Sequence, residues 1–126
     1  CNVGAKPIFA DIDLDSGNIT ADSILKVITK KTKAIICVHL GGWPCDMDPI
    51  MKIARKNKIK VIEDCSQAHG AGIKVNGKFK SVGSFGDIST LSFYPAHHIT
   101  MGEGGGVFCK SSKFAEFCPV TPVIVT

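Results

Sequence analysis

A run of apolar residues at positions 34–38, Ala-Ile-Ile-Cys-Val, constrains the fold of this chain more than any other feature. No polar residue interrupts the run, so a strand formed here would have no face suited to water. This pattern is typical of strands buried on both faces of a parallel sheet. A second such strand is predicted at residues 59–63, and a helix that opens at Asp48 and Pro49 and runs to about Asn57 lies between the two. Strand, helix and strand in this order predict right-handed crossovers and an α/β fold with a mainly parallel sheet.

The remaining elements follow from periodicity and turn chemistry. Thr20 is a suitable N-cap for a helix that runs from Ala21 to about Lys30. The alternating segment at residues 73–79 surrounds Asn76-Gly77, which predicts a β-hairpin. Further strands are predicted at residues 7–11, 88–93 and 106–109, and a last helix is predicted from a cap at Ser111 to about Phe117.

Composition excludes several classes of protein. Of the 126 residues, 44% are hydrophobic and 21% are charged, which is ordinary for a globular domain. The net charge of +4 comes from scattered lysines without a basic run, so we predict no nucleic-acid partner. The longest apolar run is too short to cross a bilayer, and no signal peptide is visible, so we predict no membrane partner.

The six cysteines do not form a recognisable metal or disulfide pattern, because no C-x-x-C pair occurs. Cys37 and Cys109 lie in apolar strand-like runs, where cysteine behaves as a small hydrophobic residue. We therefore predict a reduced, cytoplasmic protein without a metal site.

Candidate binding residues lie at or near the carboxyl ends of predicted strands, where ligands bind in open α/β sheets. Asp64 could pair with a cationic ring nitrogen, or it could cap the turn at residues 66–68. Ser92 could donate its hydroxyl to a phosphate, or it could be an ordinary strand serine. The glycines at 102 and 104–106 permit close approach of the backbone but match no nucleotide-binding fingerprint. These residues alone indicate an anion-binding site without identifying its ligand.

Several motifs occur in order along residues 4–117. They are Gly4-Ala5-Lys6-Pro7, Thr32-Lys33-Ala34-Ile35, Val38-His39-Leu40-Gly41-Gly42, Asp46-Met47-Asp48, residues 61–70, Val82-Gly83-Ser84-Phe85-Gly86-Asp87 and residues 92–105. Together they resemble the DegT/DnrJ-type sugar-nucleotide aminotransferases, which are fold-type I enzymes dependent on pyridoxal 5'-phosphate. The resemblance implies a three-layer α/β/α fold with a mainly parallel sheet. It also implies that residues 1–117 are a fragment of the large domain, followed by an atypical tail at residues 118–126.

The resemblance implies a role for each candidate residue. Asp64 would pair with the pyridine nitrogen of the cofactor, Gln67 would pack near its ring and phenolic oxygen, and Ser92 would bind its phosphate. The lysine that binds the cofactor covalently in this family stands five residues after the serine, and here that position is His97. The following residue, His98, would orient His97 or contact the substrate.

The replacement of that lysine by His97 implies a particular activity. Histidine cannot form the covalent link that a lysine amine forms, so the cofactor would be held non-covalently as pyridoxamine 5'-phosphate. An imidazole is a suitable general base near neutral pH. The motif therefore resembles the branch of 3-dehydratases that act on nucleotide-linked 4-keto-6-deoxy sugars in deoxysugar and lipopolysaccharide biosynthesis. Two alternatives stay open, a sugar-nucleotide aminotransferase and a catalytically silent α/β scaffold or regulatory protein.

The same resemblance bears on the partner proteins and on a possible second cofactor. The full-length protein would be a homodimer, with a reductase as a further partner. A [2Fe–2S] cluster is not supported by this chain, because Ser66 stands where the first cysteine ligand would lie. The chain lacks parts of the family's catalytic domain, so we predict that it is inactive by itself.

Overall fold

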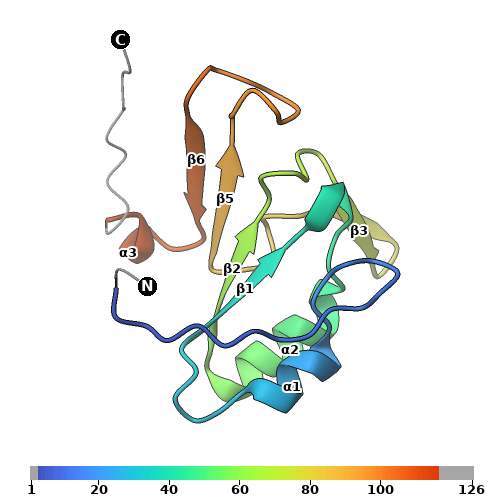
Figure 1. Ribbon diagram of the computed structural model, residues 1–126, viewed down its shortest axis with the longest axis vertical. Helices are drawn as coiled ribbons and strands as arrows, with labels where there is room; N and C mark the ends of the chain where they lie inside the picture. Colours follow the sequence, from blue (N-terminus) through green and yellow to red (C-terminus); the bar gives the residue numbers. More distant parts are fainter. Residues whose placement is uncertain (1–2, 117–126) are drawn as a thin grey trace.

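A four-stranded sheet organises residues 3–116, the part of the chain that the computed structural model describes (Figure 1). Its strands, in spatial order, are β1 (Ala34–Val38), β2 (Lys60–Asp64), β5 (Ile88–Ser92) and β6 (Gly105–Cys109). β1 pairs with β2 and β2 with β5 in parallel, whereas β5 and β6 are antiparallel. The predicted α/β class with a mainly parallel sheet is therefore confirmed.

Two helices, α1 (Ala21–Val27) and α2 (Met47–Asn57), lie next to each other beside the lower part of β1 and β2 (Figure 1). Thr20 and Ser23 form a capping box at the start of α1, which satisfies otherwise unpaired backbone N–H groups. α2 is amphipathic, and its buried residues Met47, Ile50, Met51 and Ala54 recur at helical spacing. Together with buried residues of the strands, these side chains form the core.

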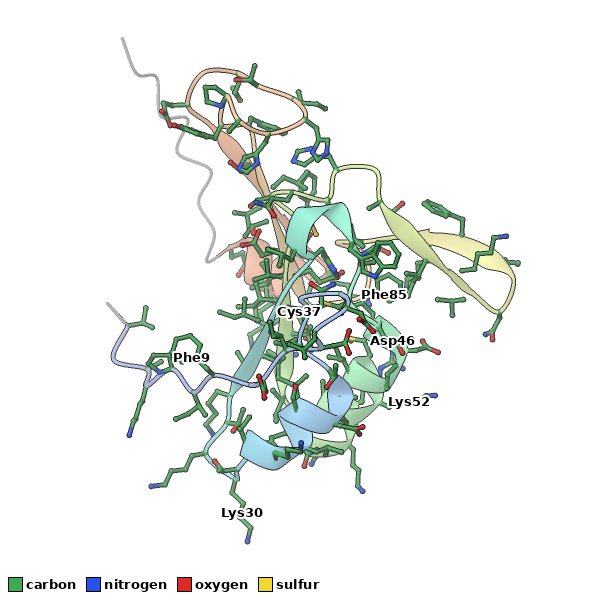
Figure 2. All side chains as sticks on the ribbon, turned by 45° about the vertical axis from the view of Figure 1, so that its right-hand side comes forward. Phe9, Lys30, Cys37, Asp46, Lys52 and Phe85 are labelled. Carbon is green, nitrogen blue, oxygen red and sulfur yellow. The ribbon has the colours of Figure 1, made fainter. Side chains whose placement is uncertain are left out.

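The two faces of the sheet differ in burial. Along β1, Ile35 and Cys37 are buried in the core that includes the helices, whereas Ile36 and Val38 on the opposite face are 60% and 43% exposed. Cys37 lies among the central side chains in Figure 2, while Lys30 and Lys52 point outward. Within residues 3–116, the prediction that this strand is buried on both faces is therefore confirmed for the face of Ile35 and Cys37 and not for the face of Ile36 and Val38. The apolar composition of the other face fits the second helical layer of a three-layer fold.

The strands β3 (Gly72–Val75) and β4 (Lys78–Ser81) form a separate antiparallel hairpin that extends away from the sheet (Figure 2). Asn76 and Gly77 both have positive φ, at 50° and 77°. This conformation is that of a type I′ turn, so the predicted hairpin is confirmed. Ile73 and Val75 pack against the core.

Three predicted elements differ from the structure in extent or existence. Residues 7–11 do not form a strand: Phe9 is 88% exposed, and the nearest pairing is an isolated bridge between Ile12 and Ile19. The first helix ends at Val27 because Ile28 is extended, at ψ 139°. The last helix, α3 (Ser112–Ala115), is capped by Ser111 as predicted but is shorter, and Phe117 and the predicted tail lie outside the described residues.

None of the helices formed within residues 3–116 has the length and apolar character needed to cross a bilayer.

Candidate functional site

The carboxyl ends of β1, β2 and β5 meet at one edge of the sheet because the three strands are parallel. At this edge Val38, Asp64 and Thr90 are in register on neighbouring strands, so their side chains lie on the same face. Ser92 is two residues beyond Thr90 and shares that face. The structure thus brings Asp64 and Ser92 to the same edge, as expected, and also to the same face.

Asp64 has two carboxylate oxygens with different surroundings. Oδ1 accepts hydrogen bonds from the Ser66 backbone N–H at 3.0 Å and from the Ser66 hydroxyl at 2.6 Å. Oδ2 accepts none from residues 3–116. The side chain is half-buried. Both sequence interpretations of Asp64 are therefore compatible: one oxygen fixes the following turn, and the other is available to a cation.

The side chains of Ser92 and Gln67 each make one hydrogen bond within residues 3–116. The Ser92 hydroxyl oxygen accepts a weak hydrogen bond from the Tyr94 N–H at 3.3 Å, which leaves its proton available. Gln67 is exposed, and its Oε1 accepts a hydrogen bond from the Gly41 N–H at 2.8 Å. Gln67 therefore joins the loop after β2 to the loop after β1.

The adjacent residues His97 and His98 direct their rings toward different partners. His97 is half-buried and its ring lies 6.2 Å from that of Tyr94, in an edge-to-face arrangement. His98 is exposed and its ring lies 5.9 Å from that of His69. No hydrogen bond or ring contact joins His97 to His98 within residues 3–116. The expectation that His98 orients His97 thus has no direct contact to support it.

His69 is a candidate that the sequence motifs contained but to which we assigned no role. Its ring contacts the Phe93 ring edge-to-face at 5.6 Å. Its Nε2 is buried and has no hydrogen-bond partner among the described residues. A buried ring nitrogen without a partner is costly, so it marks a place where a ligand or water would bind.

Beneath this edge lies a buried polar network that sequence reasoning missed. Glu63 is fully buried, and its Oε1 accepts hydrogen bonds from the Phe85 and Gly86 N–H groups at 2.8 and 2.6 Å. Its Oε2 accepts one from Gly83 N–H at 2.7 Å and lies 3.2 Å from His39 Nε2. Burial alone would raise the pKa of Glu63, but these hydrogen bonds from His39 and the backbone lower it below its usual value.

His39 is held in one tautomer by the same network. The Cys45 N–H donates to His39 Nδ1 at 3.1 Å, so the proton is on Nε2 and points to Glu63. His39, Glu63 and Cys65 place three potential metal-ligand atoms within 4.8 Å of one another. The backbone and imidazole donors already satisfy the Glu63 carboxylate, so we interpret this cluster as structural.

Glycine spacing is the sequence signal that could have revealed the network. A Cβ at Gly86 would lie 2.8 Å from the Val61 carbonyl oxygen and 3.3 Å from Glu63. Gly83 has φ +83°, which disfavours a side chain. The turn at residues 83–86 can therefore wrap around the carboxylate only because glycine stands at both positions.

Residues 1–122 match the DegT/DnrJ/EryC1/StrS aminotransferase family. GDP-perosamine synthase from Escherichia coli O157:H7 is 47% identical over 115 residues, which cover 91% of this chain and 30% of that protein. The UDP-N-acetyl-3-dehydro-alpha-D-glucosamine 3-aminotransferase of Acidithiobacillus ferrooxidans is 49% identical over 112 residues, covering 88% of this chain and 29% of that protein. The dTDP-4-dehydro-2,6-dideoxy-D-glucose 3-dehydratase of Saccharopolyspora spinosa is 41% identical over 113 residues, covering 90% of this chain and 24% of that protein.

Solved structures show the same similarity. An aminotransferase from Psychrobacter cryohalolentis superposes with a TM-score of 0.83 at 52% identity, over 89% of this chain and 28% of that one. NtdA from Bacillus subtilis, solved with bound cofactor PMP, gives a TM-score of 0.79 at 36% identity, over 89% of this chain and 24% of that one. The chain therefore spans less than a third of the length of these proteins. These matches confirm the predicted fold class, a fragment of the large domain of a fold-type I enzyme.

Proposed function

Because the chain belongs to the DegT/DnrJ/EryC1/StrS aminotransferase family, we propose that the full-length protein is a pyridoxal- or pyridoxamine-phosphate-dependent enzyme acting on a nucleotide-linked sugar. The names of its relatives support this substrate class, since they include GDP-, UDP- and dTDP-linked sugar enzymes. The observation that carries the proposal is the half-buried Asp64, whose Oδ2 lacks a partner within residues 3–116.

The residues at the carboxyl edge fit such a cofactor. Asp64 Oδ2 accepts no hydrogen bond from residues 3–116, so it can accept one from a protonated ring nitrogen, and a carboxylate there would keep that nitrogen protonated. Ser92 is placed on the same face and can donate its proton to a phosphate oxygen. The buried Nε2 of His69, which has no hydrogen-bond partner within residues 3–116, adds a polar atom near the same edge. When bound, the cofactor supplies a ring that withdraws electrons from the substrate carbon.

Amino-group transfer to a keto sugar is the activity that the relatives favour. One relative is named as a 3-aminotransferase, and the Psychrobacter cryohalolentis structure is that of an aminotransferase. In this reaction Asp64 would hold the proton at the ring nitrogen, and Ser92 would fix the phosphate.

Dehydration of the sugar is a second candidate, which His97 favours. No lysine lies between Lys80 and Lys110, so none of these positions can supply an amine to hold the cofactor covalently. His97 would instead take a proton from a carbon of the substrate through its uncharged imidazole. A homodimer, a reductase partner and a cytoplasmic location stay predictions within this proposal.

Borohydride reduction of the full-length protein with pyridoxal phosphate separates the two activities. If the protein transfers an amino group and binds the cofactor through a lysine, reduction should leave that lysine permanently labelled, and the product should be an aminated sugar. Dehydration predicts no labelled lysine and a sugar that has lost water. Absence of both cofactor binding and turnover would contradict the proposal and support a silent scaffold.

A further inference from the structure

A buried asparagine holds the loop that follows β1. This loop consists of the short helix η1 (Leu40–Gly42) and Trp43, and it begins at the end of β1 (Figure 1). The side chain of Asn18, only 4% exposed, accepts a hydrogen bond from the Leu40 N–H at 3.1 Å. Its Nδ2 donates another to the Trp43 carbonyl at 2.8 Å. Both polar ends of one buried amide thus bind the backbone of one short loop.

The same loop contacts the turn that follows β2. Gln67 Oε1 accepts a hydrogen bond from the Gly41 N–H at 2.8 Å. At Gly42, where φ is +86°, a Cβ would lie 3.1 Å from the Gln67 carbonyl oxygen, so the two backbones approach closely. The loop therefore joins Asn18 to Gln67 through direct contacts.

The turn after β2 is also the turn that fixes the candidate cofactor carboxylate. The Ser66 N–H and hydroxyl both donate to Asp64 Oδ1, at 3.0 and 2.6 Å. At the other end of the loop, the His39 N–H donates to the Asp64 carbonyl at 3.1 Å. Contacts thus run without a break from Asn18 through the loop to Gln67 and to the strand end at Asp64.

The use of an amide at position 18 favours precise placement over simple packing. A buried amide costs free energy unless both of its ends are hydrogen-bonded, and here both ends are used on the same loop. A fully satisfied buried network selects one arrangement of the groups that it joins. Binding sites need such selection, because displacing a group by about 1 Å can abolish much of its effect.

We propose that Asn18 is a positioning residue for the cofactor site. It holds the loop after β1 against the turn after β2, and in this way it fixes Gln67 and the turn that carries Asp64. Because both ends of its amide are engaged by the loop, Asn18 acts through Gly41 and Gln67 and not on the ligand itself. The inference rests on the proposed function for the identity of the ligand.

A double-mutant cycle in the full-length protein tests this role. Asn18→Ala, Gln67→Ala and the double variant are titrated with pyridoxamine phosphate, and urea unfolding of each variant reports stability separately. We expect Asn18→Ala to raise the Kd about threefold to tenfold, which is roughly the value of one hydrogen bond. If Asn18 acts through Gln67, the double variant should bind about as weakly as the weaker single variant. A residue that supports only the fold would shift the urea curve and leave the Kd of the folded protein unchanged.

Two further variants complete the design. Asn57→Ala is the matched control, since the Asn57 amide also donates to a backbone carbonyl, that of Ile53 at 2.9 Å, but lies exposed at the end of α2. It should bind pyridoxamine phosphate like the wild type. Asn18→Asp retains an oxygen for the Leu40 N–H, and it replaces Asn18→Ala in the cycle if that variant does not fold.

An unchanged Kd in Asn18→Ala would overturn the inference while leaving the proposed function intact. Effects of Asn18→Ala and Gln67→Ala that multiply in the double variant would do the same. If the wild type binds no pyridoxamine phosphate, the proposed function fails, and hydrogen exchange of the Gly41 amide then decides the structural part. Faster exchange in Asn18→Ala than in the wild type would support the holding of the loop by Asn18, and equal exchange would refute it.

Discussion

His39 and Glu63 face each other across two neighbouring strands, with Nε2 3.2 Å from Oε2 and both side chains fully buried. The same carboxylate accepts three backbone N–H groups from the turn at residues 83–86. One side chain thus joins the ends of β1 and β2 to the segment that leads into β5. Because Asp64 is the next residue along the chain, the network also fixes the strand end that presents the candidate site.

Replacing Glu63 by glutamine should strongly destabilise the fold. The substituted amide presents an N–H₂ group to backbone donors, so at least one buried donor loses its acceptor. Breaking a buried pair in this way typically costs about 3–5 kcal/mol in the free energy of unfolding. Urea unfolding of the chain measures the change. Glu103→Gln, at an exposed loop position, is the control and should differ from the wild type by less than about 0.5 kcal/mol. A similar small effect for Glu63→Gln would contradict the importance of the network.

Folding stability should fall as the pH decreases below about 4.5. Hydrogen bonds lower the pKa of Glu63 below its ordinary value of 4.5, despite burial, and Lys60 and the Val61 N–H lower that of Asp87 below 3.8. A carboxyl whose folded pKa is depressed stabilises the fold above its unfolded pKa, and this contribution is lost as the pH falls through the folded pKa. Glu63 alone gives a slope of up to about 1.4 kcal/mol per pH unit in that range.

Unfolding free energies between pH 7 and pH 3 check this dependence. The curve should be flat with respect to these two carboxyls above about pH 5. Asp87→Asn should reduce the slope of the unfolding free energy against pH in the acid range, whereas Glu103→Gln should leave this slope unchanged. A wild-type curve that rises toward acid pH would show that the sign is wrong.

Gly77→Ala should weaken the hairpin through the backbone alone. Gly77 has φ +77°, and a Cβ built there meets no other atom of residues 3–116 within 4 Å, so these residues would not crowd the side chain. An alanine held in the left-handed region costs roughly 1–2 kcal/mol. Asn76→Gly, at φ 50°, is the matched change in the same turn and should be tolerated. Hydrogen exchange of the β3 and β4 amides measures the difference. Equal exchange rates in the two variants would argue against the type I′ turn.

The sequence predicted those elements whose signal is local. The apolar run of β1, the helical spacing of α2 and the Asn76-Gly77 turn each depend on neighbouring residues, and all three are confirmed. The predicted strand at residues 7–11 was wrong because a strand also needs a paired neighbour, which periodicity does not supply. Helix ends were less accurate than helix positions, as the early end of α1 at Val27 shows.

The candidate site was predictable only in part. Asp64 and Ser92 are the last residues of β2 and β5, so parallel topology alone places them at one edge. The role of Glu63 was not predictable, since its backbone donors lie 20–23 positions later in the chain and His39 lies 24 positions earlier. The divergence of His97 and His98 likewise depends on Tyr94 and His69, whose rings come close only in the folded chain.

Asp64→Asn in the full-length protein separates the two roles of this carboxyl. The asparagine oxygen can still accept the hydrogen bonds from Ser66, so the turn should be retained. The negative charge that we propose to lie next to the cofactor ring nitrogen is lost. Removing one partner of a partly buried charge pair costs about 2 kcal/mol or more, which is roughly thirtyfold in the cofactor's Kd. Titration of the apoprotein with pyridoxamine phosphate, followed by absorbance, measures this change.

Ser66→Ala is the matched control for Asp64→Asn, because it removes the 2.6 Å hydrogen bond to Oδ1 and leaves Oδ2 untouched. If Asp64 pairs with the ring nitrogen, Asp64→Asn weakens cofactor binding much more than Ser66→Ala does. The opposite order would mean that Asp64 acts only as a cap for the turn after β2. The comparison is informative because both variants disturb the same carboxyl, one through its charge and the other through a single hydrogen bond.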